Sequence, residues 1–143
     1  MKRLLITLSC ALGALTASAQ STPPDDALYQ ALGGTPGLTK LMDDFVPRLT
    51  ADPRIAEFFK ETKLSELKKQ LVDQFCVVSG GSCIYEGETM KNSHAEMKIR
   101  KSDFNALVEV LQQSMDQQGI PFTVQNRLLA RLAPMHRDIV NTR

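Results

Sequence analysis

The chain has 143 residues, a formal net charge of +1, 43% hydrophobic residues and 23% charged residues. This composition is typical of globular proteins and excludes a disordered, collagen-like or low-complexity chain. The near-zero charge argues against a nucleic-acid-binding surface. The length suits one domain that buries a substantial core.

The first 19 residues have the pattern of a cleaved export signal. A positively charged start precedes an apolar run of twelve residues, 4–15, and Ala17-Ser18-Ala19 then supplies the small residues that a signal peptidase reads. The run is shorter than the roughly 20 apolar residues that cross a bilayer, which disfavours a retained membrane anchor. We therefore expect a signal peptide over residues 1–19, cleavage before Gln20, and an exported, periplasmic protein with no membrane span after cleavage.

Behind the leader, the hydrophobic pattern predicts helices that short breaks separate. A polar, Pro-rich linker is expected over residues 20–26, followed by a short helix from Ala27 to Leu32 that Gly33-Gly34 ends. Thr35-Pro36 combines a capping hydroxyl with proline at the first helical position, which predicts the start of a second helix. Pro47 lies inside that helix and predicts a kink, because proline has no backbone N–H to donate.

The middle of the chain predicts a short segment and a long helix. Asp52-Pro53 repeats the pattern of a helix start and leads into Phe58-Phe59. The long helix should end at Gly80-Gly81, with a loop over residues 82–87 behind it. Its apolar face is marked by Leu64, Leu67, Leu71, Phe75 and Val78.

Two helices are expected at the end of the chain. Ser102 should cap the first, which Gly119 ends, and the second should begin near Thr123. Alternation typical of strands is nearly absent, and there is no internal repeat. The sequence therefore predicts an all-α domain over residues 27–143, packed around one core.

His94 carries the most distinctive chemistry. Met90 precedes it by four positions and Met97 follows by three, so a helix would place all of them on one apolar face. The simplest interpretation is a buried histidine bonded to a backbone carbonyl. The sequence has no HExxH motif or paired Cys/His set that would favour zinc, and no Ser/His/Asp constellation. One neutral imidazole in an apolar helical cleft is, however, what a heme iron requires.

An ordered set of short motifs makes the sequence similar to a known family. The motifs are Leu28–Gly34 (LYQALGG), Asp44-Phe45, Ala51–Arg54 (ADPR), Phe58-Phe59, Leu67–Lys69, Gly80-Gly81, Tyr85–Gly87, Met90–His94 (MKNSH) and Ala133-Pro134. In this order and spacing, over about residues 27–140, the chain resembles the group I truncated hemoglobins. These are bacterial globins with a two-over-two helical sandwich around heme.

The resemblance implies heme b as cofactor and a diatomic gas (O₂, CO or NO) as ligand, with His94 bound to the iron. For the apolar residues that would enclose the ring, ordinary core packing is the alternative interpretation. His136 would contact the heme edge or bond covalently to it, and a solvent-facing histidine is the alternative there. The sequence identifies no electron donor. The other implied heme contacts are Phe59, Leu67, Leu71, Phe75, Tyr85, Met90, Ile99 and Phe104.

The chain departs from the family where the gas ligand would lie. Typical members carry a tyrosine at the position of Val46 and often a glutamine at that of Leu71, and both donate hydrogen bonds to the ligand. Here Val46, Leu67 and Leu71 would form an apolar distal pocket. Losing one or two such bonds, each worth about 1.5–3 kcal/mol, predicts oxygen dissociation that is roughly ten- to a hundredfold faster. An inward turn of Gln70 or Gln74 would reverse this expectation.

The cysteines predict a disulfide. Cys10 would leave with the leader, and its neighbours Thr7-Leu8-Ser9 fit a lipid-attachment motif poorly. Cys76 and Cys83 then remain as an even pair in an exported protein, which makes them a disulfide candidate. A bridge beside the heme would also make a redox-sensing role possible.

Three classes of function remain open at this point. The favoured one is a heme protein that binds a diatomic gas reversibly, for carriage (oxygen transport among its forms), scavenging or sensing. The second is a heme enzyme such as a nitric oxide dioxygenase or a peroxidase, and the third is a helical domain without heme. The apolar distal pocket favours the first, because peroxidase chemistry needs a polar group that moves protons.

Overall fold

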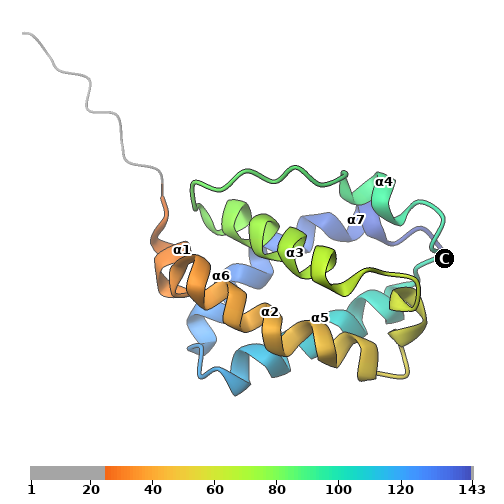
Figure 1. The fold of residues 1–143 in the computed structure, drawn as a ribbon, viewed down its shortest axis with the longest axis horizontal. Coiled ribbons are helices and arrows are strands. Elements are labelled where there is room, and N and C mark those ends of the chain that lie inside the picture. Colours follow the sequence, from red (N-terminus) through yellow and green to blue (C-terminus); the bar gives the residue numbers. More distant parts are fainter. Residues whose placement is uncertain (1–24, 143) are drawn as a thin grey trace, which may run out of the picture.

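A computed structural model describes residues 25–142 of the chain (Figure 1). Over these residues the fold is helical and contains no β-strand, which confirms the all-α prediction. The predicted leader and the first residues of the predicted linker lie outside the described residues. No helix within 25–142 is long and apolar enough to cross a membrane. In chain order the elements are α1 Ala27–Ala31, α2 Gly34–Ala51, the 3₁₀-helix η1 Ala56–Phe59, α3 Leu64–Ser79, α4 Met90–His94, α5 Lys101–Gln117, α6 Phe122–Leu132, the 3₁₀-helix η2 Ala133–Met135 and α7 His136–Ile139.

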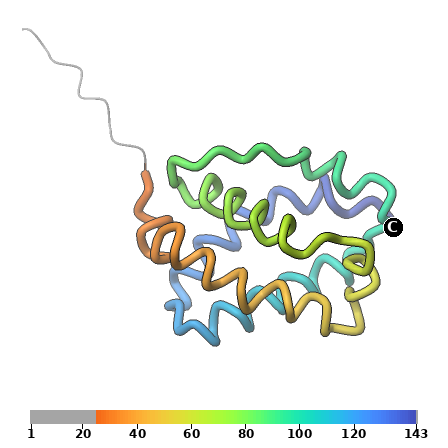
Figure 2. Tube along the Cα trace, in the orientation of Figure 1, coloured from red at the N-terminus to blue at the C-terminus, as the bar shows by residue number. Residues whose placement is uncertain are grey.

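Two helix pairs build the body of the domain. α2 and α3 run antiparallel and pack together, and they lie over α5 and α6 (Figure 1). α2 also contacts α5, and α3 contacts α6, so each pair is bound to the other. Beyond α3, the chain runs back along the length of that helix before it forms the short α4 (Figure 2).

The core lies between these pairs. Most of its fully buried side chains come from α1, α2, α5 and α6, with Ile55 and Cys76 added from outside them. Each large one contributes roughly 1.5–3 kcal/mol through removal of apolar surface from water. They include Leu28, Leu38, Leu41, Met42, Phe45, Leu49, Leu111, Met115 and Leu128.

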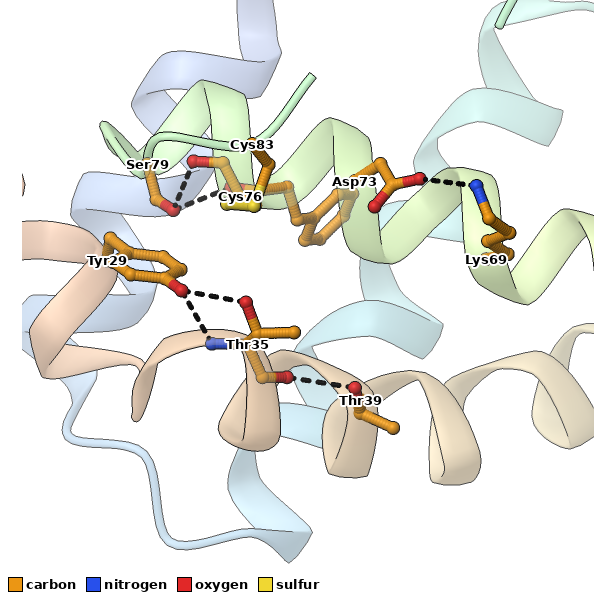
Figure 3. Close-up of a disulfide and its surroundings, with 9 residues drawn as sticks. Tyr29, Thr35, Thr39, Lys69, Asp73, Cys76, Ser79 and Cys83 are labelled. Carbon is orange, nitrogen blue, oxygen red and sulfur yellow. Dashed lines mark hydrogen bonds and ion pairs between the residues drawn. A yellow bond between two sulfur atoms is a disulfide. The ribbon is translucent and has the colours of Figure 1, made fainter. Parts of the chain in front are cut away.

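The start of α2 depends on a contact that the sequence pattern did not reveal. Thr35 is not the cap, because α2 already begins at Gly34, behind Gly33 with a positive φ of 85°. The hydroxyl of Tyr29 instead accepts a hydrogen bond of 2.9 Å from the Thr35 backbone N–H and lies 2.7 Å from the Thr35 hydroxyl (Figure 3). A side chain of α1 thereby satisfies a donor that the first turn of a helix leaves free. Further along, α2 continues through Pro47 to Ala51.

Four other predictions about the helices are wrong in detail. Ser102 lies inside α5, and the cap is formed by Arg100, whose backbone N–H donates to the Asp103 carboxylate at 2.9 Å. The single last helix is divided into α6, η2 and α7, because Pro134 cannot donate to the helix ladder. The segment after Asp52-Pro53 becomes helical only at η1, and the helix that carries His94 ends at that residue.

A disulfide joins the end of α3 to the loop behind it. Cys76 in the last turn of α3 is bonded to Cys83 (Figure 3). Gly80 adopts a φ of 96°, which lets the helix end sharply, as the sequence predicts. At Gly81 any side chain would meet the Cys76 sulfur, since a Cβ there would lie 2.5 Å from it. The two glycines thus make room for the bridge.

Reduction of this bridge should lower the free energy of unfolding by about 2.5 kcal/mol, because the cross-link restricts the unfolded chain around a short loop. Urea unfolding of the oxidised and the reduced protein measures the difference. Cys83→Ser is the matched control: its stability should equal that of the reduced protein and should not respond to reductant. Equal stability of the oxidised and reduced forms would contradict the prediction.

Candidate functional site

A cavity of about 610 Å³ opens between the helix pairs and α4. This volume lies within the range of about 300–1,000 Å³ that holds a small organic ligand or cofactor. Side chains from α2, η1, α3, α4, α5, α6, η2 and α7 line it, so most of the fold contributes to its wall. The lining is mainly aliphatic and aromatic, and among the described residues no lysine or arginine belongs to it.

The helical repeat explains why α3 supplies one wall. Leu67, Leu71 and Gln74 follow one another at intervals of four and three residues, so they lie on one face of the helix. All of them line the cavity, together with Phe75. Phe59 reaches the cavity from η1, the short segment that turns the chain from α2 into α3.

His94 presents a free ring nitrogen to this cavity. Its Nδ1 lies 2.8 Å from the carbonyl oxygen of Met90, one helical turn earlier. A carbonyl can only accept, so Nδ1 carries the proton, and in the neutral ring Nε2 then carries a lone pair. Nε2 has no hydrogen-bond partner among residues 25–142. The ring is half-buried and lines the cavity, so the lone pair is available to a ligand inside it.

Two hydroxyl groups support the short helix that carries His94. The Thr89 side chain accepts from the Asn92 backbone N–H at 3.2 Å and so caps α4. The Ser93 hydroxyl donates to the Thr89 carbonyl at 2.9 Å and lies 3.0 Å from His94 Nδ1. The imidazole Nδ1–H therefore faces two oxygens, which fix the orientation of the ring.

Gln74, like Gln70, lines the cavity, and the sequence predicted that an inward turn of either residue would reverse the expected fast dissociation of oxygen. Its side chain is buried, and its amide Nε2 lies 3.1 Å from the sulfur of Met90 and 3.9 Å from that of Met135. Thioether sulfur accepts hydrogen bonds only weakly, so these contacts hold the amide loosely. The spacing from Leu67 and Leu71 was the signal that could have placed Gln74 here.

The polar groups of the lining are mostly neutral or paired. Tyr85 donates to the Glu88 carbonyl at 3.0 Å, and burial together with the nearby Glu88 raises the pKa of its hydroxyl, which keeps it protonated. Asp103 is bonded by Arg100, whose guanidinium holds the pKa of that carboxyl below its usual range. The ion pair compensates for the burial of the Asp103 carboxylate.

The structure brings together all the predicted heme contacts except His136. The residues at the cavity wall are Phe59, Leu67, Leu71, Phe75, Tyr85, Met90, His94, Ile99 and Phe104. Val46, expected in the distal pocket, is buried but does not line the cavity, whereas its neighbour Phe45 does. Adjacent helical residues point about 100° apart, so the cavity can take one of the two and the core the other.

His136 lies behind the wall. Its ring packs edge-on against Phe104, with centroids 4.9 Å apart and planes 77° apart. Phe104 lines the cavity, but His136 does not. One aromatic ring therefore separates the second histidine from the space that His94 faces.

The comparison with known proteins gives this arrangement a family. The sequence matches the bacterial-like globins over residues 27–141. The chain belongs to this family. Among curated relatives, this globin is 26% identical to a group 1 truncated hemoglobin of Tetrahymena pyriformis over 113 residues, or 79% of this chain and 93% of that one. It is 28% identical to a group 1 truncated hemoglobin of Synechocystis sp. over 120 residues, which cover 80% of this chain and 97% of that one.

Solved structures confirm the two-over-two globin fold. The truncated hemoglobin of Tetrahymena pyriformis in its Fe(III) form superposes with a TM-score of 0.78 at 26% identity, covering 80% of this chain and 98% of that one. The 2/2 hemoglobin of Synechococcus sp., described in the cyanomet state with covalently attached heme, gives a TM-score of 0.75 at 21% identity with the same coverage. Because its identity is low, the second match supports the fold alone. The resemblance to group I truncated hemoglobins is thus confirmed.

Proposed function

We propose that this globin binds heme b in the cavity through His94 and uses it to bind a diatomic gas reversibly. The observation that carries the proposal is that the His94 ring lines an apolar cavity while its Nδ1 is bonded to the Met90 carbonyl, which leaves Nε2 as the nitrogen free to bind a ligand. Heme would supply an iron that binds O₂, CO or NO. The relatives described above are truncated hemoglobins, which supports the same cofactor here.

The residues of the cavity suit this cofactor. The porphyrin face is apolar, and Phe59, Leu67 and Phe75 supply an apolar wall. The propionate groups of heme are polar and would face Thr62 and Tyr85, which can donate hydrogen bonds from the same wall. With no lysine or arginine in the described lining, burial of the ring and the bond to His94 would provide most of the affinity.

The residues of the lining also favour reversible binding of a gas over an enzymatic reaction of the bound gas. Leu67 and Leu71 provide no hydrogen-bond donor, and Phe45 and Phe59 add only apolar surface, so the donors that α3 brings to the lining are the Gln70 and Gln74 amides. A gas bound beside these residues would be held by the iron and by its fit to the wall. A peroxidase-like reaction requires a group that takes up and releases protons. The side chains that α3 contributes to the lining include none, since the Gln70 and Gln74 amides are polar but do not titrate.

The role of His94 predicts a change of spectrum on substitution. His94→Ala should abolish the ferrous heme spectrum of the wild-type protein, because the ring that would bind iron is missing. Absorption spectra of the ferric, ferrous and CO forms after reconstitution with hemin measure this. His136→Ala is the control and should keep the wild-type spectra, since His136 lies behind Phe104. A wild-type spectrum in His94→Ala would refute the proposed iron ligand.

The apolar side chain of Leu71 predicts slower oxygen dissociation when a hydrogen-bond donor replaces it. Leu71→Gln should slow oxygen dissociation roughly ten- to a hundredfold, because the new amide can donate a hydrogen bond worth about 1.5–3 kcal/mol. Stopped-flow displacement of oxygen by CO gives the rate. Leu71→Met has a similar size without a donor and should change the rate little. If Leu71→Gln leaves the rate unchanged, a donor such as Gln70 or Gln74 already serves the ligand.

A covalent bond between His136 and the heme edge is the alternative to a freely exchangeable cofactor. The contact of His136 with Phe104 supports the noncovalent form, because the imidazole lies outside the cavity wall. Mass spectrometry of the reduced, acid-denatured holoprotein should therefore give the mass of the polypeptide alone. A mass increased by one heme, lost in His136→Ala, would establish the covalent bond instead.

Export is also proposed, on the leader pattern of residues 1–19. Expression of the full chain in a bacterium with a Sec system should yield periplasmic protein that begins at Gln20. N-terminal sequencing of the secreted form is the measurement. Material that stays in the cytoplasm with its first residues intact would contradict the proposal.

A further inference from the structure

Asn141, near the C-terminus, is bound to the segment that follows His94. Its side-chain Nδ2 donates to the carbonyl oxygen of His94 at 2.6 Å and to that of Ala95 at 3.2 Å. Its Oδ1 accepts from the Ile99 backbone N–H at 2.8 Å. The amide orientation is unambiguous, because carbonyls only accept and a backbone N–H only donates.

The backbone of the same stretch adds to this clamp. The N–H groups of Asn141 and Thr142 both donate to the Ile99 carbonyl, each at 3.1 Å. α7, which ends two residues before Asn141, packs against α4. Figure 1 shows the C-terminal end beside the chain that leads from α4 to α5.

The segment that Asn141 holds has little support of its own. α4 contains only five residues, far fewer than the 12–15 that an isolated helix needs for marginal stability. It ends at His94, whose carbonyl accepts a bond from inside the segment, from the Met97 backbone N–H at 3.1 Å. Four residues later Lys98 adopts a φ of 53°, a conformation that is costly for a side chain other than glycine. The bonds from Asn141 come from outside the segment and add to these few internal bonds in fixing where His94 sits.

We propose that Asn141 is a positioning residue for the iron ligand: it ties the carbonyl of His94 to the N–H of Ile99 and so fixes the helix end that carries the imidazole. The inference rests on the proposed function, since it gives His94 the role of iron ligand. Asn141 itself does not line the cavity and would not touch heme. Without its side chain the imidazole can shift, and the iron–histidine bond becomes weaker and less uniform.

The test compares Asn141→Ala and Asn141→Asp with Thr142→Ala in the heme-loaded protein. Thr142→Ala is the matched control, because the bond of Thr142 to Ile99 comes from its backbone and survives the substitution. Asn141→Asp keeps the acceptor for Ile99 but loses the donors to His94 and Ala95. Resonance Raman spectra of the ferrous protein report the iron–histidine stretching band, and transfer of heme to excess apomyoglobin reports its dissociation rate.

Asn141→Ala should broaden the iron–histidine band and move it to lower frequency, and heme should dissociate about tenfold faster, as expected for the loss of two or three neutral hydrogen bonds. For Asn141→Asp, the band position and the dissociation rate should lie between those of Asn141→Ala and wild type or close to those of Asn141→Ala. This variant provides the readout if Asn141→Ala does not fold. Thr142→Ala should match the wild type. Thermal unfolding of the apoproteins distinguishes a general loss of stability from a shift of the imidazole, because lower stability would not by itself move the Raman band.

Two results would overturn the inference. If the band and the dissociation rate of both Asn141 variants equal those of the wild type, Asn141 does not position His94, while the proposed heme function stands. If the wild-type protein itself shows no iron–histidine band, the proposed function fails and this inference fails with it.

Discussion

The hydrogen bond from His94 Nδ1 to the Met90 carbonyl sets which nitrogen of the ring is free to bind a ligand. It fixes the proton on one ring nitrogen and leaves the lone pair of the other for an iron. A histidine on an apolar face commonly makes such a bond as an ordinary core residue, and the bond alone does not distinguish the two roles. The difference lies in what the free nitrogen faces, which here is a large apolar cavity.

The position of that ring depends on parts of the chain far from it. α4 is too short to hold itself, and it is supported by the Thr89 cap, by the Ser93 hydroxyl and by the bonds from Asn141. The opposite wall is supported differently: α3 is long, it packs against α2 and α6, and its last turn is bridged to the following loop through Cys76 and Cys83. The site thus combines one wall that packing makes rigid with one that depends on individual hydrogen bonds. A cofactor bound between them would stabilise the fold further through mass action.

Much of the fold could be predicted from the sequence, because helical periodicity and glycine stops are local signals. The end of α3 at Gly80 follows directly from such a signal. Its predicted apolar face is correct only in part, because Phe75 is buried whereas Leu64 is exposed. The boundaries that were wrong have two kinds of cause. Tyr29 caps α2 from a neighbouring helix, a contact that a single-sequence pattern cannot show. At the start of α5 the Asp103 carboxylate, three positions after Arg100, replaces the expected Ser102 hydroxyl, and this contact is local.

For the candidate site, too, some residues could be predicted from the sequence and others could not. The apolar contacts and His94 were assigned by resemblance to a family, and Gln74 could have been added from its spacing on α3. Asn141 carries no sequence signal, because 47 positions separate it from His94 and only the folded chain brings them together. Val46 marks the limit of transferring a position from a family, since the cavity is lined by the adjacent Phe45.

The most direct test is a crystal structure of the protein loaded with heme. The account predicts one heme in the cavity, with continuous density between the iron and Nε2 of His94 and with Nδ1 still bonded to the Met90 carbonyl. Heme bound elsewhere on the protein, or an iron bound by another side chain with His94 turned away, would contradict it.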